Sequence, residues 1–91
     1  MKLQRIYISV YFEDAKSAGK KRGDVTLAFS VGDELLESIK ELSSSDIKNI
    51  IGIYSYDDLI IAAAQEDRSL GNYIKHRLKV HMENGKKNPA S

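Results

Sequence analysis

The sequence contains no cysteine, so disulfide bonds and thiolate metal sites are excluded. A chain without disulfides is typical of a reducing compartment, and we expect a cytoplasmic protein. The only proline, Pro89, lies in the polar C-terminal tail. No apolar run approaches the length of a membrane span, and residues 1–14 lack the apolar core and cleavage site of a signal peptide. We therefore expect no membrane partner.

A chain of 91 residues predicts one domain with one small core. Apolar residues make up 42% and charged residues 30%, which is the balance of a soluble globular protein. Domains near this size often gain stability by association, so a homodimer is expected. We predict a compact domain over residues 1–84 and a disordered polar tail over residues 85–91.

The net charge of +1 conceals a strong segregation along the chain. Residues 1–24 carry six basic and three acidic side chains, residues 25–67 carry two and nine, and residues 68–91 carry six and one. Basic ends around an acidic middle indicate a surface that meets a polyanion, head-to-tail self-complementarity, or merely solvated faces. The acidic cluster of the middle segment consists of Asp33, Glu34, Glu37, Glu41 and Asp46.

Two N-terminal segments alternate apolar and polar residues with the period of a half-buried strand. The apolar faces are Ile6, Ile8, Val10 and Phe12 in residues 3–12, and Val25, Leu27, Phe29 and Val31 in residues 24–31. The glycine-containing segment 15–23 between them predicts a mobile connection of an antiparallel hairpin. It is also basic, so Lys20, Lys21 and Arg22 are candidate nucleic-acid contacts.

Residues 32–45 are predicted to form a helix that Asp33 caps, because Leu35, Ile39 and Leu42 recur at nearly helical spacing. Ser44 or Ser45 is expected to cap a short helix that follows.

Residues 50–66 allow two interpretations. One is a strand over residues 50–56, a turn at Asp57–Asp58 and a second strand over residues 59–64, which would give a ββαββα order with a four-stranded antiparallel sheet. The other is a helix from about Ser55 to Asp67, which we favour because three consecutive alanines are strong helix formers and Ser55 with Asp58 resembles a capping box. The favoured fold is therefore α+β: an N-terminal antiparallel β-hairpin followed by about three helices.

The last helix is predicted to begin after Ser69, a favourable N-cap, and to end at Gly85. Its apolar residues recur every fourth position. Together with two residues of the preceding helix they define a face that serves the core or a dimer contact: Leu59, Ala63, Leu70, Ile74, Leu78 and Met82.

The segment "LIIAAAQEDRSLGNYIKHRLK" combines an alanine-rich helix, a polar corner and a serine-capped amphipathic helix. Over residues 56–83 this pattern resembles the helix pair of the ribbon-helix-helix (MetJ/Arc-like) family. The resemblance implies a dimer whose two-stranded ribbon enters the DNA major groove. It also implies that the backbone at Ser69, Leu70 and Gly71 meets a phosphate, with Gly71 small enough to allow close approach.

The same resemblance assigns supporting positive charge to Arg68, Lys75 and Lys79. In that family the DNA-reading strand precedes the first helix of the pair, which here corresponds to residues 46–56. A clearer strand-then-helix pattern stands earlier, in residues 24–42, whose outward residues are Thr26, Ala28 and Ser30.

Other chemistry finds little support in the residue pattern. His76 and His81 are five positions apart, about 140° around a helix, whereas joint metal ligation needs a spacing of four. Asp57–Asp58 is typical of a cap or turn, and no nucleophile or phosphate-binding loop is recognisable. We therefore expect no enzyme activity, no metal and no cofactor.

The leading hypothesis is a small, non-enzymatic, DNA-binding regulator or accessory protein that acts as a dimer. The resemblance implies transcription regulation in a prokaryotic, phage or plasmid setting, with double-stranded DNA as partner. The alternative is a protein-binding module or inhibitor that turns its acidic surface toward a partner such as a nucleic-acid enzyme. Four tyrosines could contribute to such a protein–protein interaction: Tyr7, Tyr11, Tyr54 and Tyr56.

Overall fold

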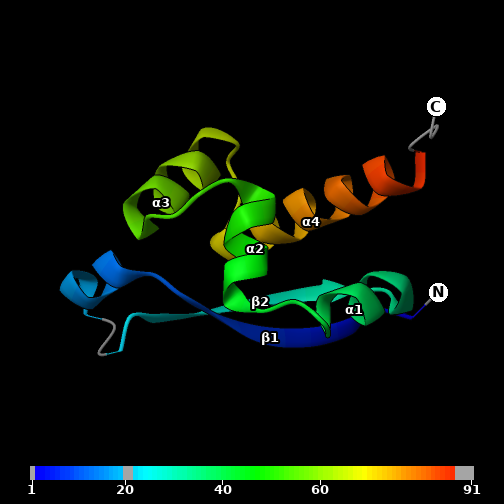
Figure 1. Cartoon of the computed structure of the whole chain (residues 1–91), viewed down its shortest axis with the longest axis horizontal. Coiled ribbons are helices and arrows are strands. Elements are labelled where there is room, and N and C mark those ends of the chain that lie inside the picture. The colour runs from blue at the N-terminus through cyan, green and yellow to red at the C-terminus, as the bar shows by residue number, and fades with distance from the viewer. Residues whose placement is uncertain (1, 20–21, 88–91) are drawn as a thin grey trace.

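A computed structural model of the chain describes residues 2–19 and 22–87 (Figure 1). Two strands, β1 (Gln4–Tyr11) and β2 (Asp24–Val31), flank a short 3₁₀ helix, η1 (Glu13–Ala18). Four helices follow: α1 (Asp33–Ile39), α2 (Ser44–Ile51), α3 (Tyr56–Gln65) and α4 (Leu70–Lys87). The predicted α+β fold with its N-terminal hairpin is confirmed, with four helices where about three were expected. The alternative four-stranded sheet is wrong, because residues 56–65 are helical.

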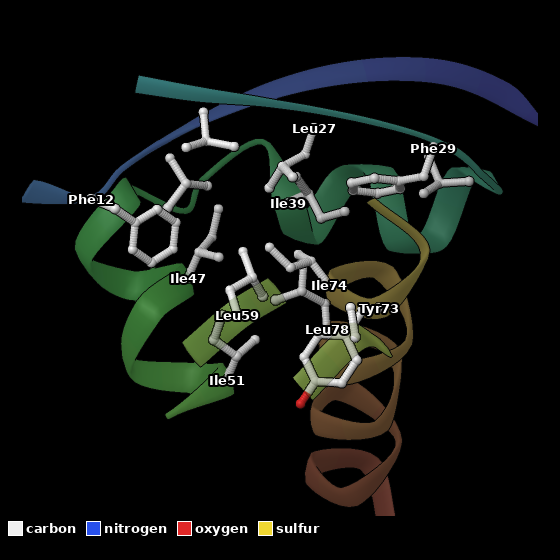
Figure 2. Close-up of a cluster of buried hydrophobic side chains, with 14 of the residues drawn as sticks. Phe12, Leu27, Phe29, Ile39, Ile47, Ile51, Leu59, Tyr73, Ile74 and Leu78 are labelled. Carbon is white, nitrogen blue, oxygen red and sulfur yellow. The ribbon is translucent and has the colours of Figure 1, made fainter. Parts of the chain in front are cut away.

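The hairpin pairs β1 and β2 antiparallel from Gln4 opposite Val31 to Tyr11 opposite Asp24. The predicted alternation of β2 is confirmed, since every second residue from Val25 to Val31 is buried. The helices lie on this inner side of the hairpin (Figures 1 and 2). The outer face therefore remains at the surface, and it carries the exposed residues Arg5, Tyr7, Ser9 and Thr26.

A single core lies between the inner face of the hairpin and the four helices (Figure 2). Large side chains from distant parts of the sequence meet there, and each is at most 2% exposed: Phe12, Leu27, Phe29, Leu59, Ile74 and Leu78. Burial of apolar surface of this kind is the main favourable term in folding. The core gives every helix of the chain a fixed place against the hairpin.

The connection between the strands is more ordered than predicted, because η1 occupies its first half. The Asp14 carboxylate accepts hydrogen bonds from the Ser55 hydroxyl (3.0 Å) and from the backbone N–H groups of Tyr56 (2.8 Å) and Asp57 (3.2 Å). These donors stand at the start of α3, where backbone N–H groups lack helical acceptors. The interaction ties the closed end of the hairpin to α3.

Two of the predicted helix N-caps are wrong, those of α1 and α2. Asp33 lies inside the first turn of α1, and the N-cap is Gly32, which makes no side-chain cap bond. Helix α1 ends at Ile39, and Leu42 lies beyond it. Ser43 rather than Ser44 or Ser45 caps α2, because its hydroxyl accepts from the N–H of Asp46 while the Asp46 carboxylate accepts from the N–H of Ser43. Only the first of three serines has the acid at the capping-box spacing.

The start of α3 is as predicted, with the Ser55 hydroxyl accepting from the N–H of Asp58 at 3.3 Å. The end of α4 is not, because the helix continues through Gly85 to Lys87. Glycine costs about 1 kcal/mol in a helix interior, which is too little to terminate a helix by itself. Residues 85–87 of the predicted tail are thus helical, and residues 88–91 lie outside the described residues. None of the described helices is long and apolar enough to cross a membrane.

Candidate nucleic-acid interface

The corner between α3 and α4 is built by backbone hydrogen bonds. The N–H of Arg68 donates to the Ala63 carbonyl at 2.9 Å, and Asp67 adopts a left-handed conformation with φ of 56°. Asp is one of the few residue types besides glycine that tolerates this conformation. The corner therefore joins α3 to α4 through four residues, 66–69, and fixes where α4 begins.

Ser69 caps α4, as predicted. Its hydroxyl accepts from the N–H of Asn72 at 3.2 Å, and its carbonyl accepts from the N–H of Tyr73 at 2.8 Å. The side chain of Ser69 is exposed and that of Leu70 is half-buried against the core. The capping geometry places the first turn of α4 with its backbone N–H groups at the corner, where the helix dipole favours an anion.

Gly71 has a different role from the one predicted. It is buried, and a Cβ atom added to it would lie 2.2 Å from the carbonyl oxygen of Ala28. The missing side chain therefore allows α4 to cross the outer edge of β2 at close range. The space that the resemblance assigned to a phosphate is occupied by the backbone of β2.

The remaining predicted contacts of the corner surround one polar hollow of about 490 Å³. Its lining includes four of the predicted residues and four that were not predicted: Arg68, Ser69, Lys75 and Lys79, with Glu66, Asp67, Asn72 and His76. Lys79 lies one turn after Lys75 and His76 on α4, so helical spacing brings the three side chains to one side of the helix. The hollow is open and polar, which suits a charged surface ligand better than an apolar small molecule.

The cations of the hollow differ in how far they are already neutralised. The guanidinium of Arg68 pairs with the Glu66 carboxylate at 3.3 Å. Among the described residues, Lys75 and Lys79 make no ion pair. The ammonium groups of these two lysines are therefore available to bind an anion, in a hollow that Glu66 and Asp67 also line. They also border a second, smaller hollow of about 240 Å³, which Leu3, Leu35 and Met82 line as well.

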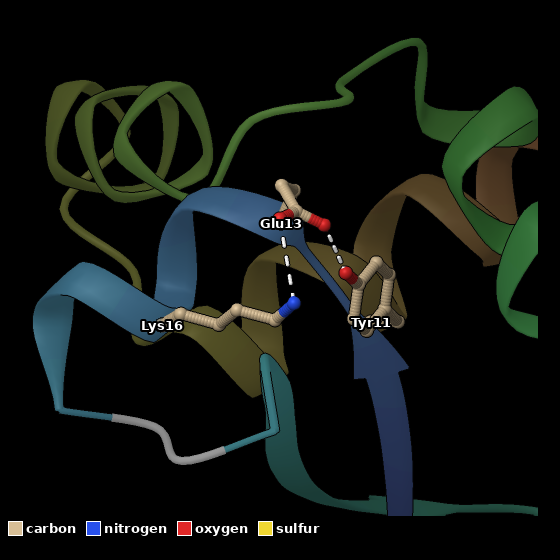
Figure 3. A network of polar contacts seen from close by, with 3 residues as sticks. All are labelled: Tyr11, Glu13 and Lys16. Carbon is tan, nitrogen blue, oxygen red and sulfur yellow. Dashed lines mark hydrogen bonds and ion pairs between the residues drawn. The ribbon is translucent and has the colours of Figure 1, made fainter.

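The basic connection predicted as a second contact is only partly described. Lys16 is engaged, since its ammonium lies 3.3 Å from the Glu13 carboxylate, which also accepts from the Tyr11 hydroxyl (Figure 3). The Tyr11 hydrogen bond, followed by Lys16, lowers the pKa of Glu13, and the contacts with Tyr11 and Glu13 raise the pKa of Lys16. Arg22 is exposed, and Lys20 and Lys21 lie outside the described residues.

The residues predicted as a core or dimer face are mostly internal to one chain. Leu59, Ala63, Ile74 and Leu78 are each at most 2% exposed. Leu70 and Met82 are half-buried and pack against the same core. A dimer contact would therefore have to use other surfaces.

The outer face of the hairpin combines Tyr7, a predicted protein contact, with Arg5, which the residue pattern assigned to no site. Tyr7 is 68% exposed, and the guanidinium of Arg5 lies 6.0 Å from the centre of its ring. The alternation in residues 3–12 indicated the outward direction of these side chains, but only the burial of the opposite face shows that they are free to meet a ligand. Tyr7 pairs with Ala28, whose backbone contacts Gly71, so the outer face and the start of α4 are neighbours.

No group of three or more histidine, aspartate or glutamate side chains among the described residues is placed to hold a metal ion. Comparisons with family models, curated proteins and solved structures found no match to this chain.

Proposed function

We propose that the chain is a small, non-enzymatic, DNA-binding regulator or accessory protein that binds the phosphates of double-stranded DNA at the α3–α4 corner. One observation carries the proposal: Lys75 and Lys79 lie without ion pairs, among the described residues, around an open polar hollow at the start of α4. A phosphate there would gain two ammonium groups and the favourable end of the helix dipole.

The shape of the hairpin supports double-stranded DNA over other polyanions. A two-stranded antiparallel ribbon fits the major groove of B-DNA. The outer face of this ribbon offers Arg5, Ser9 and Thr26, side chains that can bond base edges or phosphates. Because α4 crosses the edge of β2, phosphate contacts at the corner and groove contacts at the ribbon fall on adjoining surfaces.

The helical conformation of residues 56–65 and the Ser69 cap also support the helix-pair part of the ribbon-helix-helix resemblance. The ribbon departs from that family, because both strands come from one chain and α2 stands where the family has its strand. A dimer, a prokaryotic, phage or plasmid setting and a cytoplasmic location follow from the proposal.

The test is binding to a mixed-sequence duplex, measured by fluorescence anisotropy over a series of salt concentrations. We expect binding at low salt that weakens steeply as salt rises, because bound phosphates release their counterions. Lys75→Ala and Lys79→Ala should each weaken binding. Each should also make the plot of log K against the logarithm of the salt concentration shallower, by about 0.9 in slope for every phosphate that the variant no longer binds. Lys40→Ala is the matched control, since Lys40 is an exposed lysine at the end of α1 that pairs with Glu37.

Two results would reject the proposal. One is no binding to duplex at low salt by a protein with native circular dichroism. The other is equal loss of affinity in Lys40→Ala, Lys75→Ala and Lys79→Ala, because equal losses would reflect net charge rather than a site.

A second candidate is a protein-binding module or inhibitor. It is favoured by the exposure of the whole acidic cluster: Asp33, Glu34, Glu37, Glu41 and Asp46. An acidic surface of this kind can imitate the charge of nucleic acid toward a basic partner. Glu37→Lys with Glu41→Lys should abolish binding to such a basic partner, whereas a DNA contact confined to α4 predicts that the affinity for DNA changes only through the net charge.

A further inference from the structure

The outer edge of β1 is an open sheet edge over its first half. In an antiparallel ladder, successive residues alternate between bonding the neighbouring strand and pointing their N–H and C=O groups away from it. The N–H of Phe12 donates to Gly23 across the hairpin at 2.8 Å, so even-numbered residues of β1 face β2 and odd-numbered ones face outward. Ser9 agrees, because its carbonyl accepts from the Ser44 hydroxyl of α2 at 3.2 Å.

Arg5 and Tyr7 therefore present their backbone N–H and C=O groups at this edge. No backbone or side-chain partner for these groups occurs among the described residues. Unpaired strand edges of this kind are templates for a further strand, and natural proteins usually block them with proline, bulges or covering elements. Around Arg5 and Tyr7, β1 has none of these.

A groove of about 400 Å³ runs beside the open edge, and its lining is mostly apolar but includes Ser9, Lys40 and Ser44. Ile6 and Ile8 form its strand side and are only half-buried, although their partners Phe29 and Leu27 are 1% and 2% exposed. Leu36 and Leu42 line the opposite side. Core side chains thus reach the surface at this edge. A further strand paired with β1 would bury Ile6 and Ile8 under its own inward-facing side chains.

We propose that the open edge of β1 binds β1 of a second copy of this chain, antiparallel and with Ile6 opposite Ile6, to form a continuous four-stranded sheet. In this register Arg5 of each copy bonds Tyr7 of the other through backbone N–H and C=O groups. The register stops short of Ser9, whose carbonyl Ser44 already occupies. A register centred on Tyr7 would instead set Arg5 against Ser9, whose carbonyl the Ser44 hydroxyl already contacts.

The side chains of β1 complement one another in this register. On the inner face Ile6 meets Ile6, and the groove is closed by the second copy. On the outer face Arg5 meets Tyr7, a pair that already makes a cation–π contact within one chain at 6.0 Å.

This contact differs from the ribbon of the ribbon-helix-helix family, in which the paired strand immediately precedes the helix pair. Association can be measured without DNA. The dimer leaves the hollow at the α3–α4 corner uncovered, but it replaces the two-stranded ribbon that fits the major groove with a four-stranded sheet. A monomer that binds DNA would contradict the dimer and its edge contact but not the DNA contact, and a dimer that does not bind DNA would contradict the DNA contact alone.

The first experiment is sedimentation equilibrium of the whole chain from micromolar to millimolar concentration. We expect a reversible dimer. Tyr7→Pro removes the outward N–H without removing a bond to β2, which is the one kind of strand position where proline is tolerated. It should raise the dimer dissociation constant about tenfold or more, because one N–H···O bond is lost in each half of the symmetric pair. Tyr7→Thr, which keeps the N–H, is the matched control and should dimerise.

The second experiment does not depend on how well the proline variant folds. Because the chain has no cysteine, oxidative cross-linking can be read without background. A mixture of Arg5→Cys and Tyr7→Cys chains should form a disulfide-linked heterodimer, since directly paired strand residues have the Cα separation that disulfides need. Neither variant alone should link efficiently.

A monomer over the whole concentration range would overturn the edge contact. So would a folded Tyr7→Pro chain that dimerises as tightly as Tyr7→Thr, or cysteine chains that link as well alone as in the mixture. A preferred link between two Tyr7→Cys chains would overturn the register centred on Ile6.

Discussion

The hairpin has two outer edges, formed by strands of equal length, and they differ in whether a helix covers the backbone. Helix α4 crosses the edge of β2 and seals it at Ala28, where Gly71 has no side chain to hold the backbones apart. Among the described residues, the edge of β1 is closed at Ser9 alone, by the Ser44 hydroxyl of α2. The backbone of β2 is thus covered at Ala28, whereas the backbone of β1 at Arg5 and Tyr7 is available to a partner.

The difference teaches that the covering of a sheet edge depends on one close crossing rather than on the strand itself. Both strands have alternating β-branched or aromatic residues, and neither contains proline. What distinguishes them is tertiary: a helix can reach the backbone of β2 because its second residue is glycine. An edge without such a crossing stays open and invites association.

Gly71→Ala should have the largest effect on stability, because it adds a side chain where α4 contacts the edge of β2. The added Cβ would stand 2.2 Å from the Ala28 carbonyl oxygen, a backbone atom that cannot turn aside. We expect a loss of about 2–3 kcal/mol in the free energy of unfolding, as for overpacked cores, although alanine is by itself the better helix former. Urea denaturation measures it.

Asn72→Ala is the matched control for that substitution, because Asn72 is the next residue of α4 and is exposed. It should change the unfolding free energy by less than about 0.5 kcal/mol. A Gly71→Ala chain that is as stable as Asn72→Ala would mean that α4 does not depend on close contact with β2.

The helices and strands could be predicted from local sequence patterns. Most features that could not be predicted depend on contacts between residues far apart in the sequence. Alternation in residues 24–31 and the fourfold spacing from Leu70 to Leu78 each depend on a face that a core must bury, and both were correctly predicted. The corner at Ser69 was also correct, since a cap depends on neighbours only. The N-cap of α2 was predicted at the wrong serine, because three adjacent serines can each cap a helix. Ser43 is the cap because Asp46 stands three residues after it.

The role of Gly71 shows why the candidate site was predicted less well than the fold. From the sequence, a glycine at the start of a helix is equally suited to a phosphate and to a neighbouring strand. Only the path of β2, more than forty residues earlier, selects the second. The grouping of Lys75 with Lys79 followed from helical spacing, whereas the pairing of Arg68 with Glu66 depended on the shape of the corner.

Asp14 connects the closed end of the hairpin to the start of α3, and its contribution to stability should depend on pH. Its carboxylate accepts from the N–H of Tyr56, which is the main cause of its lowered pKa, with further bonds from Asp57 and Ser55. A carboxyl whose pKa is lower in the folded state stabilises the fold above its unfolded pKa of about 3.9. That contribution is lost as pH falls through the folded pKa.

Asp14→Asn should therefore be less stable than the parent chain at pH 7, and the difference should shrink toward zero below the folded pKa of Asp14. Urea denaturation at both pH values measures it. Asp24→Asn is the control, because Asp24 is exposed and its side chain makes no hydrogen bond among the described residues. A difference for Asp14→Asn that is the same at both pH values would show that the contact does not depend on the charge.

Ser44→Ala should have the smallest effect on stability and the most informative one on the comparison of edges. It removes the hydroxyl that closes the edge of β1, an exposed hydrogen bond of 3.2 Å, and should cost about 0.5–1 kcal/mol in unfolding free energy. It also frees the Ser9 carbonyl, which lengthens the open edge. If the edge is the dimer contact, the variant should dimerise at least as tightly as the parent chain although it is less stable.

Ser45→Ala, at an exposed neighbouring position of α2, is the control for both measurements. Weaker dimerisation of Ser44→Ala would show that α2 supports association instead of limiting the edge at which it occurs.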